Sequence, residues 1–388
     1  MAIGLPKVDV IFTGLANTAV VRSGRGIACL IINDNTGMDT LELSKTKKEN
    51  VVNEEDLKVK SVITEDKILK QYKGFTEVEK TDYAEENYKI IEDVFLTELN
   101  KLYVIKIPND KTFDDIKPFI KKDINWITYI GETREEQKKL ADFVKLENKS
   151  RSKRLKAICY NLQEAEADDM HIVNFVNASV IKADGKSLVG YKYLGRLLGV
   201  LAGCRMDMSV TYNILSDLNN VEQIGDTDAI NEAIGKGKFV LINDDDGVRI
   251  ARGVNSLQKN DKEHTEDMKY ITIVEAMDLI YEDIVNTFKQ VYLGRFKNSY
   301  DNQVLFISAI NSYFRDLARE EILDPNYNNI SFVDIEKQRE TWIENGKLEA
   351  TNWSDIQVKN NTFRTNVYLQ ANVKFLNAME DLLFIVNM

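Results

Sequence analysis

The sequence predicts a multi-domain protein of the mixed α/β (α+β) class, and three patterns support this prediction. Between residues 108 and 250, apolar runs typical of buried strands alternate with amphipathic helical patterns, which favours a largely parallel sheet. Residues 265–345 are mainly helical in pattern, and both ends of the chain have the pattern of strands. The length of 388 residues allows two or three domains at roughly 150 residues each.

The individual elements follow from hydrophobic periodicity. Strands are expected at 26–32, 102–107, 126–130, 155–160 and 171–176, helices at 81–99, after the cap Thr133, at 192–201, 268–292 and 303–322, and a hairpin at 239–254 with its turn at Asp244 to Gly247. In the helix at 192–201 and just beyond it, Gly195, Gly199 and Gly203 recur every four residues. This spacing indicates that another element packs closely against that helix.

Both termini are predicted to carry strands that need a sheet from elsewhere. Near the start, apolar side chains alternate with other residues, and a polar, glycine-bearing segment at 14–25 follows as a tether. Near the end, a two-residue periodicity covers 363–375, and a second apolar strand covers 382–386. Because unpaired strand edges template association, these strands are expected to join sheets between subunits. The arm strands are assigned to Val8, Val10, Phe12, Leu382, Phe384 and Val386, and the tether to Gly14, Asn17 and Gly24.

Composition and charge exclude several classes of function. Lys plus Arg is 51 and Asp plus Glu is 62, so the net charge is −11, which disfavours binding to nucleic acid or to an anionic membrane. The start has no signal-peptide pattern and no apolar run is long enough to span a membrane, so we expect a soluble protein without a classical export signal. The three cysteines, Cys29, Cys159 and Cys204, lie far apart in apolar surroundings and are expected to be buried free thiols.

The search for reactive groups predicts no catalytic, cofactor-binding or metal-binding residues. The chain has two histidines, His171 in an apolar strand and His264 in a charged loop, and a structural role is expected for both. A pair of Cys159 and His171 is conceivable, but no third group singles it out. Metal-ligand spacings and a phosphate-binding loop are absent from the sequence. The basic cluster at 145–156 is expected to be a solvated helix end, with docking of an acidic partner as the alternative.

Five segments resemble a known family. These are Met1 to Val8 with Thr18 to Ile27, Gly195 to Tyr212 (GRLLGVLAGCRMDMSVTY), Asn243 to Leu257 (NDDDGVRIARGVNSL), Met277 to Ile280 with Gly294 to Asp301 (GRFKNSYD), and Phe375 to Leu382 (FLNAMEDL). In this order they are similar to contractile tail sheath proteins, of the kind found in myoviruses of Gram-positive hosts, related defective prophages and R-type bacteriocins. The resemblance runs over nearly the whole chain.

The resemblance implies an architecture and a function. It implies an N-terminal β-sandwich-like domain at 26–107, a subtilisin-like α/β domain at 108–255 and a C-terminal sheath domain at 256–375, with exchanged arms at 1–25 and 376–388. It further implies a homo-oligomer of hexameric rings stacked helically around an inner tail tube, in contact with baseplate and tail terminator proteins, that contracts to drive the tube through a target envelope. Such a protein is assembled in the bacterial host cytoplasm and resides in a virion or phage-tail-like particle. It is not an enzyme, needs no cofactor, binds no nucleic acid and inserts into no membrane.

Two other classes stay open from the sequence. An α/β hydrolase would need a nucleophile with an oriented base, and activity profiling would reveal it. A monomeric binding module would stay monomeric at high protein concentration, whereas a sheath protein would polymerise into tubes.

Overall fold

The computed structural model describes residues 19–37, 65–149 and 154–388. The chain divides into two compact units, and each is described by itself. The first, here called the α/β unit, comprises 23–282 together with 377–388. The second, here called the C-terminal unit, comprises 283–376 together with 19–22.

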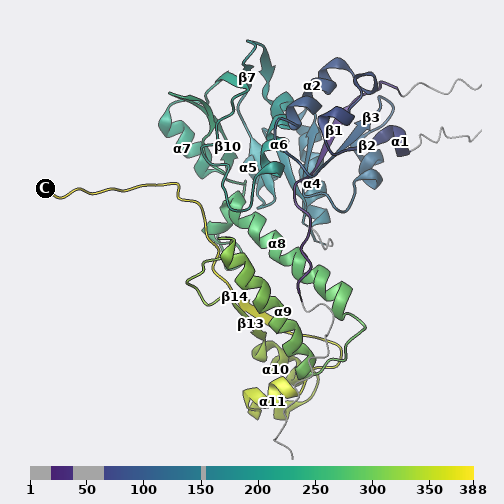
Figure 1. Ribbon diagram of the computed structural model, residues 1–388, viewed down its shortest axis with the longest axis vertical. Helices are drawn as coiled ribbons and strands as arrows, with labels where there is room; N and C mark the ends of the chain where they lie inside the picture. Colours follow the sequence, from purple (N-terminus) through teal and green to yellow (C-terminus); the bar gives the residue numbers. More distant parts are fainter. Residues whose placement is uncertain (1–18, 38–64, 150–153) are drawn as a thin grey trace, which may run out of the picture. The chain divides into compact units, whose positions relative to one another are not determined.

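The α/β unit is built on one seven-stranded sheet (Figure 1). The strand order is β10-β6-β5-β4-β1-β3-β2, and every neighbouring pair is parallel except β2 with β3, which is antiparallel. The strands are β1 (Ile27–Asn33), β2 (Leu69–Tyr72), β3 (Lys101–Ile107), β4 (Trp126–Ile130), β5 (Lys156–Tyr160), β6 (Ile172–Phe175) and β10 (Lys238–Phe239). The largely parallel sheet expected from the sequence is therefore confirmed.

Helices cover both faces of this sheet, so β1 is buried on both sides. Ala28, Leu30 and Ile32 belong to the core on the face covered by α2 and α6, whereas Cys29 and Ile31 belong to the core on the face covered by α3 and α4. A strand in this position has no polar face, which explains the continuous apolar run. The helices of this unit are α1 (Glu65–Ile68), α2 (Glu85–Val94), α3 (Phe113–Ile116), α4 (Arg134–Glu147), α5 (Glu164–Ala167), α6 (Leu194–Gly203) and α7 (Thr227–Gly235). Short 3₁₀ helices of this unit lie at Phe75–Glu77, Lys80–Asp82, Lys117–Phe119, Gly190–Tyr193 and Glu266–Lys269, and one of the C-terminal unit lies at Leu348–Asn352.

Two local predictions for this unit are confirmed. The hydroxyl and backbone of Thr133 form a capping box with Glu136 at the start of α4. The glycine face of α6 packs directly on α2, because a Cβ added to Gly199 would lie 2.2 Å from the carbonyl oxygen of Val94. Only a residue without a side chain allows this approach.

The predicted boundary between a β-sandwich-like domain at 26–107 and an α/β domain at 108–255 is wrong for the described residues. Strand β1 pairs with β3, which belongs to the first predicted domain, and with β4, which belongs to the second. Both segments therefore contribute to one sheet and cannot form separate cores. The subtilisin-like character of this sheet stays a prediction.

Two smaller sheets complete the α/β unit. Strands β7 (Ser179–Lys182), β8 (Ser187–Val189) and β9 (Leu218–Val221) form one of them in the order β8-β7-β9. Strands β11 (Leu241–Asp244) and β12 (Gly247–Ile250) form a hairpin in which Asp244 faces Gly247. The hairpin expected at this turn is confirmed.

The C-terminal unit packs helices against a two-stranded sheet. Helix α8 (Ile271–Thr287) supplies its last five residues to this unit and its preceding residues to the α/β unit, and a π-helical turn follows at Phe288–Tyr292. The other elements are α9 (Tyr300–Arg319), β13 (Ile330–Val333), α10 (Ile335–Glu344), α11 (Asp355–Asn360) and β14 (Leu369–Asn372). Within the described residues, no helix combines the length and apolar character needed to cross a bilayer.

Two predicted elements are shorter in the structure. The helix expected at 81–99 is confined to α2, and the strand expected over 363–375 is confined to β14. A strand forms only where a partner supplies hydrogen bonds, and β13 offers β14 four residues. One further bridge, between Leu323 and Phe375, extends the pairing beyond β14.

Candidate functional site

The sheet of the C-terminal unit has a register that shows where its backbone groups point. Ser331 of β13 lies opposite Ala371 of β14. Three residues further along, the N–H of Asp334 donates to the carbonyl of Tyr368 at 3.0 Å. Opposed residues in an antiparallel ladder alternate between hydrogen-bonded and non-hydrogen-bonded pairs. Ser331 and Ala371 are therefore a non-hydrogen-bonded pair, and the backbone groups of each point away from the other strand.

The outer edge of β13 is closed by a side chain. Asn311 of α9 accepts the N–H of Ser331 through Oδ1 at 2.6 Å and donates through Nδ2 to the carbonyl of Ser331 at 3.3 Å. The outer edge of β14 has no such cover from the described part of the chain. The sheet has two strands, and the N–H and C=O groups of Leu369 and Ala371 point away from β13. Among the described residues, the edge of β14 is thus left open to a further strand.

A groove lies beside this edge. Its volume is about 600 Å³, and apolar residues from α8, the π-helical turn, α9 and β14 line much of it. The apolar lining residues include Ile284, Phe288, Phe306, Ile310, Leu369 and Ala371. An added strand would place alternate side chains on this face of the sheet. The groove therefore suits a strand with apolar residues at every second position.

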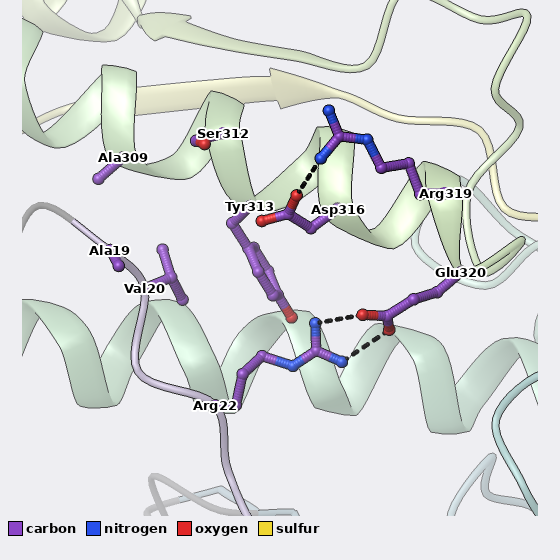
Figure 2. Close-up of a pocket in the computed structure, with 9 residues that line it drawn as sticks. All are labelled: Ala19, Val20, Arg22, Ala309, Ser312, Tyr313, Asp316, Arg319 and Glu320. Atoms are coloured by element: carbon purple, nitrogen blue, oxygen red, sulfur yellow. Dashed lines mark hydrogen bonds and ion pairs between the residues drawn. The ribbon is translucent and has the colours of Figure 1, made fainter.

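The N-terminal arm is anchored to the C-terminal unit where its described part begins. The N–H of Val21 donates to Thr287 Oγ1 at 2.9 Å. The guanidinium of Arg22 reaches Glu320 at 2.8 Å and lies 5.4 Å from the centre of the Tyr313 ring. Figure 2 shows Arg22, Tyr313 and Glu320 beside a cavity along α9, whose volume is about 550 Å³. Charge pairing and ring contact together fix the direction in which the chain arrives at this unit.

The predicted N-terminal site residues fall into two groups. Val8, Val10 and Phe12, with Gly14 and Asn17, lie outside the described residues, so their roles stay predictions.

Gly24 is described and lies in a segment with specific contacts. In the next residue, the Arg25 guanidinium lies 3.5 Å from Glu275 and 3.6 Å from Glu282. Val21, Arg22 and Arg25 thus have specific contacts, and the tether role of Gly24 stays a prediction.

The C-terminal arm presents apolar side chains to solvent. Leu382 is 89% exposed, Phe384 is 78% exposed and Val386 is 66% exposed. Leu383 and Ile385 between them are exposed as well. These residues pair with no strand among the described part of the chain, and Figure 1 draws them as an extended trace. A run of five exposed apolar residues indicates a segment that is buried only against a partner.

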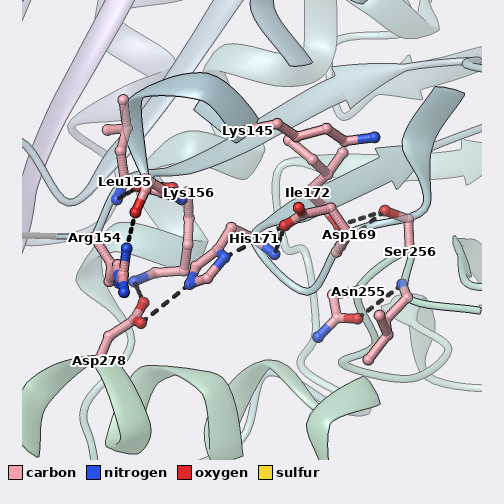
Figure 3. A network of polar contacts seen from close by, with 12 residues as sticks. Lys145, Arg154, Leu155, Lys156, Asp169, His171, Ile172, Asn255, Ser256 and Asp278 are labelled. Carbon is pink, nitrogen blue, oxygen red and sulfur yellow. Dashed lines mark hydrogen bonds and ion pairs between the residues drawn. The ribbon is translucent and has the colours of Figure 1, made fainter. Parts of the chain in front are cut away.

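Histidine 171 belongs to a buried ion network (Figure 3). Its Nε2 lies 3.1 Å from Asp278 Oδ1, and Lys156 donates to the other oxygen of Asp278 at 2.8 Å. Burial alone would lower the pKa of His171, but the charge of Asp278 and the hydrogen bond with Asp169 outweigh it and raise the pKa to about 9. The imidazole is therefore an ion-pair partner at neutral pH, in keeping with the expected structural role.

This network also explains part of the basic cluster at 145–156. Lys156 is fully buried against Asp278, and Glu275 lies 3.3 Å from its ammonium group. The N–H of Arg154 donates to Glu282 at 2.9 Å. These two cluster residues face carboxylates of α8 in the same chain, so for them the expectation of a solvated helix end is wrong.

Cysteine 159 is not activated as a nucleophile. It is fully buried in the core on the α4 face of the sheet, and burial raises the pKa of its thiol. Cys29 is also a buried free thiol, whereas Cys204 is a partly exposed free thiol. The free state of all three is confirmed.

The ion pair of His171 predicts a pH dependence of stability. Since the folded pKa lies above the ordinary value of 6.5, its contribution is complete below pH 6.5 and is lost as the pH rises through about 9. The shift corresponds to at most about 3 kcal/mol. Urea unfolding between pH 6 and pH 10 should show a larger loss of stability for the wild-type protein than for His171→Gln, which cannot titrate. Equal losses in both proteins would contradict the assignment.

Comparisons with known proteins relate these features to one family. Residues 263–388 match the model of the phage tail sheath C-terminal domain. The tail sheath protein of Clostridium phage phiCD119 is 28% identical over 380 residues, covering 98% of this chain and 98% of the relative.

Two solved structures share the fold. A sheath tail protein from Desulfitobacterium hafniense superposes with a TM-score of 0.63 at 13% identity, covering 84% of this chain and 94% of the other. The PVC sheath complex of an extracellular contractile injection system, in its contracted state, gives a TM-score of 0.64 at 10% identity, covering 100% of this chain and 98% of the other. Residues 263–388 are thus similar to a phage tail sheath C-terminal domain, and the whole chain is similar to a curated tail sheath protein.

Proposed function

We propose that this protein is the structural subunit of a contractile tail sheath. The observation that carries the proposal is that one chain holds both halves of a strand-addition joint. The open edge of β14 beside its apolar groove is an acceptor, and the exposed apolar run at 382–386 is a donor. A donor and an acceptor on the same chain favour open-ended linkage between copies.

In the proposed assembly, subunits form hexameric rings that stack helically around an inner tail tube. Arm strands from neighbouring copies, at Val8 to Phe12 and at 382–386, add to the sheet of the C-terminal unit and keep the lattice connected. Contraction repacks the other interfaces and drives the tube through the target cell envelope. The subunit meets the tube protein, a baseplate and a tail terminator, within a virion or phage-tail-like particle assembled in the bacterial cytoplasm. The curated homologue named as a tail sheath protein supports this role.

The proposal assigns no catalytic step to the chain. His171 is engaged by Asp169 and Asp278 in a buried ion network. Its shifted pKa follows from structural pairing, which perturbs pKa values as effectively as an active site does.

Negative-stain electron microscopy tests the proposed function. At high concentration the wild-type protein should form tubes, whereas the double variant Leu382→Asp with Phe384→Asp should stay dispersed, because two charges would enter an apolar groove. Both side chains are exposed in the single chain, so the melting temperature should be unchanged. Asn387→Asp is the control, since it adds a charge beyond the donor strand and should still give tubes.

The possible failures are separable. A wild-type protein that stays monomeric at high concentration would contradict the sheath function and favour a binding module. Tubes formed equally well by the double variant would contradict strand donation by the C-terminal arm while leaving polymerisation intact.

A further inference from the structure

Three of the segments that carry the sequence resemblance converge on one point of the α/β unit. Glu380 comes from the last of them, Ser209 and Thr211 from the segment ending at Tyr212, and Arg252 from the segment around the β11–β12 hairpin. More than 100 positions separate Glu380 from the other three in the sequence. None of these residues takes part in the strand-addition joint.

Glu380 is held almost completely out of solvent. Its side chain is 6% exposed. Its Oε1 accepts hydrogen bonds from Thr211 Oγ1 at 2.6 Å and from Ser209 Oγ at 3.1 Å. Arg252 approaches the other oxygen, with Nε 3.5 Å from Oε2. Oε1 therefore has two hydroxyl donors, whereas Oε2 accepts no hydrogen bond and is compensated by the charge of Arg252 alone.

Arg252 holds the next residue as well. Its Nη2 lies 2.6 Å from Asp381 Oδ1, so one guanidinium contacts two successive carboxylates of the arm. The N–H of Gly253 donates to Thr211 Oγ1 at 2.8 Å, which fixes the hydroxyl that binds Glu380. A side chain at Gly253 would crowd this hydroxyl, since an added Cβ would lie 3.2 Å from it. The receiving groups are therefore ordered by the backbone of the α/β unit.

The contacts of Glu380 and Asp381 lie directly before the donor strand in the chain. Asp381 is the last residue of the arm with a hydrogen bond to another part of the described chain, and the exposed apolar run begins at the next residue. On the other side, the N–H of Leu376 donates to the carbonyl of Ile322 at 3.1 Å. The contacts to Glu380 and Asp381 thus shorten the free chain ahead of the donor strand from about six residues to about one.

We propose that Ser209, Thr211 and Arg252 form a clasp that positions the C-terminal arm for donation to a second copy of this chain. The proposal rests on the proposed sheath function, because the partner is another subunit. The clasp fixes the point at which the arm leaves the α/β unit, so the donor strand is offered at a defined place. It also passes any pull on the arm directly to the α/β unit.

The length of the tether determines how much the loss of the clasp changes the protein concentration needed for tube formation. Effective concentration falls roughly as the −3/2 power of the length of a flexible tether, so lengthening it from about one residue to about six lowers it about 15-fold. Loss of the clasp should therefore raise the protein concentration needed for tube formation by about tenfold. The donor strand and its acceptor edge remain intact, so tubes should still form above that concentration.

Two clasp variants are compared with the wild-type protein. One is the double variant Glu380→Gln with Asp381→Asn, and the other is the single variant Thr211→Val. Glu232→Gln is the matched control, because Glu232 is an exposed acid of the same unit that pairs with Lys236. Amide hydrogen exchange at 377–382 is measured in the monomer, and the concentration for tube formation is measured by pelleting. Both clasp variants should exchange faster and need about tenfold more protein, while the control matches wild type.

Each outcome decides a specific point. Unchanged exchange in both clasp variants would show that the contacts do not hold the arm, and would overturn the proposal. Faster exchange with an unchanged concentration for tube formation would also overturn it, because the contacts would then have no positioning role. If the wild-type protein forms no tubes at all, the sheath function fails, and the exchange measurement still reports on the contacts themselves.

Discussion

Replacing Ala371 by proline should raise the protein concentration needed for tube formation while leaving the subunit folded. The register places the N–H of Ala371 on the outer side of β14, where no strand of the described chain receives it. Proline removes this donor, and proline is tolerated on an edge whose N–H groups face outward. An incoming strand would then carry an unpaired carbonyl, which costs about 1–3 kcal/mol at each contact. That corresponds to roughly a 5- to 150-fold higher concentration for assembly.

Gln370→Pro is the matched control for this variant. Gln370 faces Phe332 in a hydrogen-bonded pair, so its N–H serves the sheet within the subunit. This control should lower the melting temperature of the monomer, whereas Ala371→Pro should change it little. Tubes formed by folded Ala371→Pro protein at the wild-type concentration, seen by negative-stain microscopy, would show that β14 is not the acceptor edge.

Replacing Gly199 by alanine should lower the stability of the α/β unit by roughly 2 kcal/mol. The added Cβ would lie 2.2 Å from the carbonyl oxygen of Val94 and 3.0 Å from its carbonyl carbon. These are backbone atoms of α2, which cannot move aside as a flexible side chain can. Overpacking of a core costs about 1–3 kcal/mol and occasionally more, and a backbone contact belongs at the upper end. The gain in helix propensity offsets about 1 kcal/mol of this.

Urea unfolding measures this effect, with Gly235→Ala as the control. Gly235 ends α7, and an added Cβ there would meet no atom within 4 Å. The control should change stability by less than about 1 kcal/mol. Equal effects of the two substitutions would contradict close packing of α6 on α2.

The core of the α/β unit could be predicted from the sequence because its signals are local. The apolar run at 126–130 coincides with β4, and Thr133 caps α4 through a capping box readable as T-x-x-E. The glycine spacing in α6 indicated close packing, although the partner helix α2 could not be named. The domain boundary near residue 107 was wrong because strand pairing between distant segments leaves no local mark.

The candidate site was harder to predict, because its chemistry depends on residues distant in the sequence. Asn311 lies on a helix, and only the fold brings its amide to the edge of β13. Glu380 and Arg252 carry no periodic signal, and each resembles an ordinary surface charge in the sequence. The apolar run at 382–386 was visible in the sequence, but its paired form cannot be seen in a single chain. A segment that is completed by another copy has no partner within its own fold.

In the proposed sheath, the amide of Asn311 affects how many edges of the β13–β14 sheet are open to strands from other copies. Because it occupies the backbone groups of Ser331, a strand added at that point of β13 would find both groups already engaged. A sheet open at both edges could branch, and branching leads to irregular aggregates. A sheet that is open at one edge can be extended in one direction only, so it does not branch. In the proposed sheath, Asn311 would therefore favour ordered addition of subunits over branching.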